Sequence, residues 1–350
     1  MTTLTESPRT VFTPPAGAFA PAPAETRGRG RDAVRMLVAQ PTGIEHATFA
    51  DLPRHLRAGD VVVVNNSATV AGEIDAYGPQ GPVVLHVATP LEDGSWVVEV
   101  RTAPDAARAV LDGTDGDRFV VAESALTLVE PYPRRGSSPT GTGNRLWRAT
   151  ATGDLSAALH TAGRPVAYGY LDRRYPLSAY QSVFATVPGS AEMPSAGRPF
   201  TRALVTELVS RGVAVAPITL HTGLSSQEAG EAPQAERFEV TSGTARLVNA
   251  VRAGGGRVVA VGTTVTRALE SAVAGGRLVP RRGWTERVIT PADPPRVVTG
   301  LITGWHDPQA SHLLLVEAVA GAELTQHAYD AAVAGGYRWH EFGDSALLLP

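Results

Sequence analysis

The sequence predicts an α/β fold: a mixed sheet covered by helices, with a small β-barrel inserted into the chain. Short β-branched runs, such as 61–64 and 258–261, are typical of strands buried on both faces. From residue 153 onward such runs alternate with helical segments, which favours a sheet covered by helices. Between residues 67 and 152 only short strand-like runs occur, separated by Gly and Pro, which favours a barrel.

These sequence patterns predict how the chain is divided into domains. Residues 1–30 are rich in Pro, Ala and Gly without periodicity, and we expect an extended or loose arm there. Residues 31–66 and 153–350 form the α/β domain in this interpretation, and residues 67–152 form the barrel. The barrel is an insertion because α/β elements occur on both sides of it.

The first half of the chain is predicted to be mostly strands. Arg35–Ala39 reads as a first strand, Leu52–Leu56 as a brief helix and Asp60–Asn65 as a buried strand. Residues 134–143 read as a loop. The predicted strands of the barrel are Pro82–Ala88, Ser95–Thr102, Arg118–Val129 and Asn144–Thr152.

The second half is predicted from helix caps and buried runs. Side chains that accept a hydrogen bond from the first helical turn favour helix starts at Asp154, Thr201, Ser242 and Thr325. The corresponding ends are Gly163, Gly212, Ala253 and Gly335-Gly336. Further helices are expected from Thr263 or Thr264 to Gly275-Gly276 and over Ser311–Val319, with strands at Val213–Leu220, Val258–Val261, Val297–Ile302 and Ala346–Leu349.

Composition excludes several kinds of chemistry. The sequence has no Cys, and all 31 of its Lys and Arg residues are Arg. Disulfides, thiolate catalysis, sulfur-ligated zinc, Schiff-base lysines and Walker-type phosphate lysines are therefore excluded. The net charge of −3 indicates no general nucleic-acid-binding surface. Without an apolar run of membrane-spanning length or a secretory signal, we expect a cytoplasmic protein without membrane association.

The strongest local feature is the segment 257–271, where a buried strand runs through Gly262 directly into a helix. The unpaired N–H groups of a helix start, together with the hydroxyls of Thr263 and Thr264, would bind a carboxylate or phosphate. Arg267 follows one turn later. In the alternative interpretation, the threonines only cap the helix and Arg267 pairs with Glu270 or another surface carboxylate.

Other candidate residues lie in loops and at strand ends. A rigid loop contains Pro194, Ser195, Ala196 and Gly197, and its small residues would let a ligand approach the backbone. His221 and Gly223 follow the end of the predicted strand 213–220, and Thr303 and His306 follow the end of the predicted strand 297–302. Each of these segments also has a purely structural interpretation. No spacing of His, Asp or Glu matches a metal site, so we predict no metal.

These segments, in this order, resemble the S-adenosylmethionine:tRNA ribosyltransferase-isomerases of queuosine synthesis. The resemblance runs from about residue 30 to the end of the chain. The stretches that carry it include 59–66, 180–184, 194–201, 213–223, 261–271, 301–311, 328–329, 337–338 and 343–346. The chain resembles a divergent member of the family, because it has Ala68 and Glu73 where the family pattern has arginines, and Glu231 and Gln234 where it has histidines.

The resemblance implies an α/β domain with an inserted β-barrel, and it implies a transferase reaction. The family moves the ribosyl part of S-adenosylmethionine, a co-substrate, onto a 7-aminomethyl-7-deazaguanine base in tRNA. The product is epoxyqueuosine, and adenine and methionine are released. The methionine carboxylate is assigned to the corner at 262–264 with Arg267. His221, His306 and Glu236 are the candidates for proton transfer or substrate orientation.

Two alternatives stay open at this point. The protein could use S-adenosylmethionine with a small-molecule acceptor in place of tRNA carrying a 7-deazaguanine base. It could also be a non-catalytic module that binds S-adenosylmethionine. Adenine release separates the two enzymes from the binding module. The sequence predicts no oligomeric state.

Overall fold

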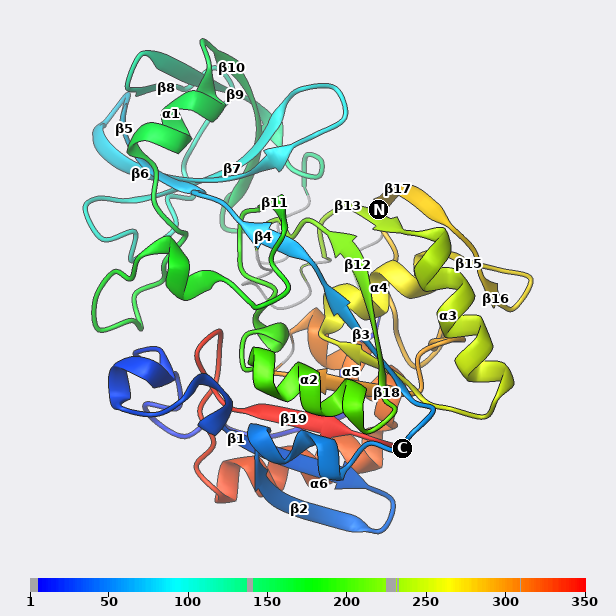
Figure 1. The fold of residues 1–350 in the computed structure, drawn as a ribbon. Coiled ribbons are helices and arrows are strands. Elements are labelled where there is room, and N and C mark those ends of the chain that lie inside the picture. The colour runs from blue at the N-terminus through cyan, green and yellow to red at the C-terminus, as the bar shows by residue number, and fades with distance from the viewer. Residues whose placement is uncertain (1–5, 137–140, 225–230, 232, 309) are drawn as a thin grey trace.

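A computed structural model of the chain describes residues 6–136, 141–224, 231, 233–308 and 310–350. Within the described residues, nine strands form one mixed sheet in the order β17-β13-β12-β3-β14-β18-β19-β1-β2 (Figure 1). Its central strands β12, β3, β14 and β18 are parallel to one another. The strands are β1 (Arg35–Gln40), β2 (Gly43–Thr48), β3 (Val61–Asn65), β12 (Ala214–Leu220), β13 (Glu236–Val240), β14 (Val258–Val261), β17 (Arg281–Thr285), β18 (Gly300–Thr303) and β19 (Ser345–Leu348).

Helices cover both faces of this sheet. Alternate residues of β3 pack into two different clusters, with Val61 and Val63 on one face and Val62 and Val64 on the other. The first face is covered by α3 (Ser242–Ala253), α4 (Thr263–Ser271), α5 (Ser311–Ala320) and α6 (Ala322–Ala334). The second is covered by α2 (Arg202–Ser210) and the 3₁₀ helix η3 (Phe49–Arg54). Burial on both faces explains why β3 is a continuous run of apolar residues.

A second sheet closes into a barrel, in the strand order β10-β7-β6-β5-β8-β9 within the described residues. Its interior is filled by apolar side chains such as Leu85, Phe119 and Trp147, and α1 (Leu155–Ala162) packs against them. The strands are β5 (Glu73–Gly78), β6 (Gly81–Pro90), β7 (Trp96–Thr102), β8 (Arg118–Val121), β9 (Ser124–Pro131) and β10 (Leu146–Thr152). The expected fold, a helix-covered mixed sheet with an inserted small barrel, is therefore confirmed.

Between the barrel and the large sheet, β4 (Ser67–Thr69) pairs in parallel with β11 (Val187–Ser190), as Figure 1 shows. The run expected at 118–129 is two strands, because the chain turns at Ala122, which has a φ of 51°. The strands β2, β5, β13 and β17 were not predicted. Their sequences carry charged residues and lack the β-branched runs that mark the other strands.

The helix caps are partly as expected. Asp154 and Thr201 accept hydrogen bonds from the first turns of α1 and α2. Thr241, one residue before the expected cap, caps α3. The cap expected at Thr325 is wrong, because this residue lies inside α6 and its hydroxyl bonds the carbonyl of Gly321.

The helix α4 ends at Ser271, so the expectation that it continues to Gly275-Gly276 is wrong. Both glycines have positive φ and form the turn of a hairpin between β15 (Val273–Ala274) and β16 (Arg277–Leu278). Glycine is the residue that adopts this conformation without strain, so the same pair that suggested a helix end instead makes a turn.

The described part of the N-terminal arm, residues 6–30, packs on the α/β part over some of its length and includes a 3₁₀ helix, η1 (Ala24–Arg27). Phe12 stacks on Trp339 at 5.3 Å between ring centroids, and the Ala20 N–H donates to the Trp339 carbonyl at 3.1 Å. Ala18, Ala20, Ala22 and Ala24 are buried. Residues 18–24 therefore pack against the rest of the structure, whereas residues 25–30 are exposed. Within the described residues, no helix has the length and apolar character needed to cross a membrane.

Candidate active site at the carboxyl ends of the parallel strands

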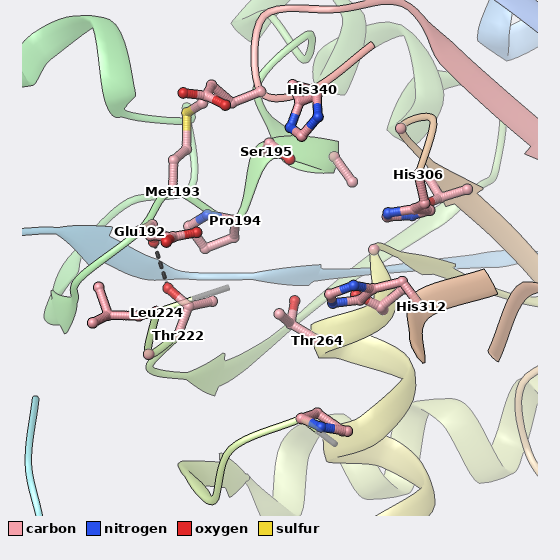
Figure 2. A pocket seen from close by; sticks show the side chains of 18 of the residues that line it. Glu192, Met193, Pro194, Ser195, Thr222, Leu224, Thr264, His306, His312 and His340 are labelled. Atoms are coloured by element: carbon pink, nitrogen blue, oxygen red, sulfur yellow. Dashed lines mark hydrogen bonds between the residues drawn. The ribbon is translucent and has the colours of Figure 1, made fainter. Parts of the chain in front are cut away.

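A cavity of about 240 Å³ opens where β14 and β18 end. Its wall is formed by the residues after these strands, by the loop 191–196, by the segment 222–224 after β12, and by residues 340–341. Figure 2 shows side chains of these segments pointing toward a common space, among them Ser195, Thr264, His306 and His312. Ligands of α/β proteins commonly bind at this edge of the sheet.

One wall of the cavity is the start of α4. Gly262, the residue before the helix, has φ +94° and ψ 162°, a conformation essentially restricted to glycine. Its N–H donates to the Ile302 carbonyl at 2.7 Å, so the turn is fixed to the neighbouring strand. Thr263 and Thr264 both line the cavity, and the N–H groups of a first helical turn have no partner within the helix. The corner can accept an anion.

Arg267 lies one turn further along α4 and is buried. Its guanidinium is paired with the carboxylate of Glu236, and it also donates to the Gln234 carbonyl at 2.9 Å. The alternative of a surface pair with Glu270 is therefore wrong. The carboxylate of Glu270 instead accepts backbone N–H groups of 296–298, at 2.8 to 2.9 Å.

Glu236 is held from two sides, because its other oxygen accepts the Gly223 N–H at 3.1 Å. Burial raises the pKa of the Glu236 carboxyl, and the nearby Arg267 opposes that shift. Glu236 thus neutralises much of the charge that Arg267 presents to the cavity. Both residues lie on the cavity wall, as does Gln234.

His306 follows β18 and lines the cavity. Its Nε2 lies 2.9 Å from the Thr303 hydroxyl, and its ring stacks on His312 with 5.0 Å between centroids. Burial lowers the pKa of His306 well below its usual value, and His312 and His340 add to the effect. Burial also lowers the pKa of His312 to about 4, with a contribution from Arg267. Both rings are therefore neutral at pH 7, and each has a nitrogen able to accept a proton.

His221 and Gly197 do not line this cavity. The Nδ1 of His221 lies 2.8 Å from the Ser67 hydroxyl, in a buried group with Ser190. Burial lowers the pKa of His221 to about 4, and Arg237 adds to this. This histidine connects β4, β11 and the end of β12. The other predicted residues share the cavity wall: Pro194, Ser195, Ala196, Gly223, Glu236, Gly262, Thr263, Thr264, Arg267, Thr303 and His306.

Several cavity residues were missed by the sequence interpretation. Glu192, Glu341, Tyr168, Tyr180 and His312 all line the wall. Glu192 precedes the predicted loop at 194–197 by two positions, which was a usable signal. Glu341 and Tyr168 lie in segments without any local pattern that distinguishes a site from a surface loop. The described residues contain no group of three or more His, Asp or Glu arranged to hold a metal ion.

Comparison with known proteins decides the family. The model of a family described as queuosine biosynthesis protein matches residues 10–348. The chain belongs to this family. A member from Moorella thermoacetica, named S-adenosylmethionine:tRNA ribosyltransferase-isomerase, is 35% identical over 96% of this chain and 97% of its own length. A protein of the same name from Acidiphilium cryptum is 35% identical over 91% of this chain and 93% of its own length.

A solved structure supports the same membership. The crystal structure of an S-adenosylmethionine tRNA ribosyltransferase from Thermotoga maritima aligns with a TM-score of 0.53 and 27% identity. The alignment covers 97% of this chain and 99% of that one. The whole architecture of this queuosine biosynthesis family member, barrel included, thus has a counterpart of known structure.

Proposed function

We propose that the protein transfers and isomerises the ribosyl moiety of S-adenosylmethionine onto 7-aminomethyl-7-deazaguanine in tRNA, giving epoxyqueuosine and releasing adenine and methionine. The observation that carries this proposal is 35% identity, over 96% of the chain, to a relative named for that activity. The cavity at the strand ends supports it, because it is large enough to enclose much of a nucleoside. Since tRNA is a cytoplasmic substrate, the proposal also places the protein in the cytoplasm.

The α4 corner would hold the methionine carboxylate. The N–H groups beside Thr263 and Thr264 and the positive end of the helix dipole favour a carboxylate there. Arg267 would act mainly by fixing Glu236 and the segment at 234, because its guanidinium is already engaged with them. The small residues Ser195 and Ala196 leave room for a ligand to lie against the backbone.

His306 is the proposed proton acceptor. The positive sulfonium acidifies the neighbouring 5′ carbon, so a neutral, positioned base would suffice to begin the reaction. His306 is neutral because desolvation lowers its pKa, and Thr303 orients its ring. His221 would act on structure only, through Ser67, because it lies off the cavity wall.

The decisive test is incubation of the purified protein with S-adenosylmethionine, with and without tRNA carrying 7-aminomethyl-7-deazaguanine. Adenine is measured by chromatography and the modified nucleoside by mass spectrometry. We expect adenine release that depends on the modified tRNA, with epoxyqueuosine formed in equal amount. Adenine release without transfer to tRNA would instead point to a different acceptor.

A variant separates the role of His306 from general damage. His306→Asn keeps a polar side chain but removes the base, and we expect turnover to fall by about 100-fold or more, as is typical when a general base is lost. His327→Asn, on the exposed side of α6, is the control and should retain full turnover. Unchanged turnover in His306→Asn would show that this histidine is not the proton acceptor.

A further inference from the structure

Two short 3₁₀ helices contribute to the cavity wall. Tyr180 is the last residue of η4 (Leu177–Tyr180), and Ser195 and Ala196 belong to η5 (Ser195–Gly197); all three line the cavity. Each helix is preceded by a proline, which has no side-chain group that could cap it. A single 3₁₀ turn has poor internal hydrogen bonds, so contacts from other segments must fix its position.

Arg198 joins these two helices from behind the wall. It directly follows η5, and its Nε donates to the Ala179 carbonyl of η4 at 2.9 Å. Its guanidinium also lies 4.8 Å from the ring of Phe342, next to the cavity residues 340–341. Only 4% of the Arg198 side chain is exposed. Since Arg198 does not line the cavity itself, it acts on the wall through these contacts.

The carboxylate partner of Arg198 is Glu25, from the N-terminal arm. The Arg198 Nη2 donates to both carboxylate oxygens of Glu25, at 3.1 Å each. Burial lowers the pKa of the Arg198 guanidinium, and the Glu25 carboxylate opposes this shift. A buried cation is costly without a counter-charge, so Glu25 stabilises Arg198 in its place behind the wall.

Glu25 also binds a second arginine. The Arg31 Nε donates to the Glu25 Oε1 at 3.1 Å, and the Arg31 Nη1 donates to the Gln181 carbonyl at 2.8 Å. Burial acts to raise the pKa of Glu25, but the arginines and a backbone hydrogen bond outweigh it and lower the pKa. One ionised carboxylate thus pairs with two arginines, and these donate to the carbonyls on either side of Tyr180.

We propose that Glu25 is a positioning residue of the S-adenosylmethionine site. Through Arg198 and Arg31 it fixes the part of the cavity wall formed by η4 and η5. The identity of the ligand rests on the proposed function. Glu25 does not line the cavity, so it contributes to the shape of the site and not to the chemistry. Its side chain is 39% exposed, and water therefore weakens both ion pairs.

Calorimetry with S-adenosylmethionine on the full chain tests the proposal. Glu25→Gln keeps the shape of the side chain but removes its charge, and Arg31→Gln removes one of the two arginines. The double variant shows whether these residues act together. The controls are Arg29→Gln, exposed in the same arm, and Glu92→Gln, exposed in the barrel. Urea titrations and turnover at saturating S-adenosylmethionine and modified tRNA are measured for each variant.

We expect the dissociation constant for S-adenosylmethionine to rise about 3- to 10-fold in Glu25→Gln. A hydrogen bond to a charged group can be worth about 10- to 100-fold, and the exposure of Glu25 reduces this. Arg31→Gln should have a smaller effect, and the double variant should bind no more than about twofold more weakly than Glu25→Gln. Turnover at saturation should stay within about twofold of wild type, because only ground-state binding is lost. Both controls should bind as the wild type does.

The proposal is overturned if Glu25→Gln binds S-adenosylmethionine within twofold of wild type, or no more weakly than Arg29→Gln. It is also overturned if the fold-changes of the two single variants multiply in the double variant. A purely structural role of Glu25 would lower the free energy of unfolding and leave the dissociation constant of the folded protein unchanged. If Glu25→Gln does not fold, Arg31→Gln alone carries the test, and unchanged binding in it overturns the proposal.

Failure of this inference is distinct from failure of the proposed function. A wild type that forms epoxyqueuosine while Glu25→Gln binds S-adenosylmethionine normally would leave the reaction standing and remove the positioning role. A wild type that binds S-adenosylmethionine but releases no adenine with the modified tRNA would remove the proposed reaction. In that case weaker binding by Glu25→Gln would still support the positioning role.

Discussion

At the scale of single residues, Gly262 determines the shape of the anion corner. Its φ of +94° and ψ of 162° let β14 pass directly into α4, which exposes the first N–H groups of the helix to the cavity. A side chain there would also lie 3.3 Å from the Ala196 Cβ, across the same wall. One glycine therefore sets both the direction of the helix and the width of the cavity next to it.

Replacing this glycine tests that interpretation. Gly262→Ala should lower the free energy of unfolding by about 1–3 kcal/mol, the cost of a disfavoured backbone conformation, and should weaken binding of S-adenosylmethionine. Denaturant titration and calorimetry measure the two effects. Gly243→Ala, within α3, has only an ordinary contact at 3.7 Å and should be neutral or stabilise by up to about 1 kcal/mol. Equal effects of the two substitutions would contradict the special role of Gly262.

At the scale of elements, the barrel depends on a buried network of charges as well as on apolar packing. His86 of β6 lies between Glu73 of β5, at 3.0 Å, and Glu99 of β7, at 3.3 Å, and all three side chains have no exposed surface. Arg101 and Arg145 also contact Glu99, at 2.6 and 3.3 Å. Such a network joins neighbouring strands specifically, because a buried carboxylate without a partner is costly.

Removing His86 should therefore loosen the barrel. In His86→Leu the buried carboxylates of Glu73 and Glu99 each lose one partner but keep an arginine, so we expect a loss of about 1–3 kcal/mol of stability. Hydrogen exchange should accelerate in β5, β6 and β7 more than in the large sheet. The control is His160→Leu on α1, an exposed histidine outside the network, which should leave exchange in these strands unchanged. Uniform acceleration throughout the chain would argue against a local role of the network.

At the scale of the whole molecule, histidines with shifted pKa values link stability to pH in two directions. The pKa of His221, His306 and His312 is lowered by burial, so these rings stay neutral in the folded protein. Burial also acts to lower the pKa of His86, but the adjoining carboxylates outweigh it and raise the pKa above 6.5. The stabilisation from His86 is fully present below pH 6.5 and is lost as the pH rises through its folded-state pKa.

The three neutral histidines predict a loss of stability in mild acid. Between pH 6.5 and 5 the unfolded chain binds protons at these positions and the folded chain does not, so the free energy of unfolding falls with pH. Each such proton contributes up to about 1.4 kcal/mol per pH unit. Urea titrations across this range should show a shallower slope for His312→Asn than for the wild type or for His327→Asn. An unchanged slope in His312→Asn would contradict a neutral His312 in the folded protein.

The division into an arm (1–30), an α/β domain (31–66 and 153–350) and a barrel (67–152) remains a prediction. The described strands of the barrel all fall within the last of these ranges. The arm, however, contributes Phe12 to the aromatic cluster around Trp339 and Tyr329. Its removal would therefore expose core surface of the α/β part.

The sequence by itself determined the class of fold and indicated the region of the candidate site. Continuous β-branched runs such as β3 and β14 report burial on both faces, and side-chain caps such as Asp154 and Thr201 report helix starts, because both signals are local. Parallel strands share one carboxyl edge, so residues after β14 and β18 could be expected to meet.

Only the tertiary structure decided which of these side chains face the ligand space. His221 ends a strand as expected, but it turns to Ser67, and Arg267 meets Glu236 instead of Glu270. Glu192 and Glu341, from distant segments, each accept from a tyrosine hydroxyl, and the rings of these two tyrosines are stacked. Such pairings depend on strand register and on how loops cross, and the local pattern of a chain contains neither.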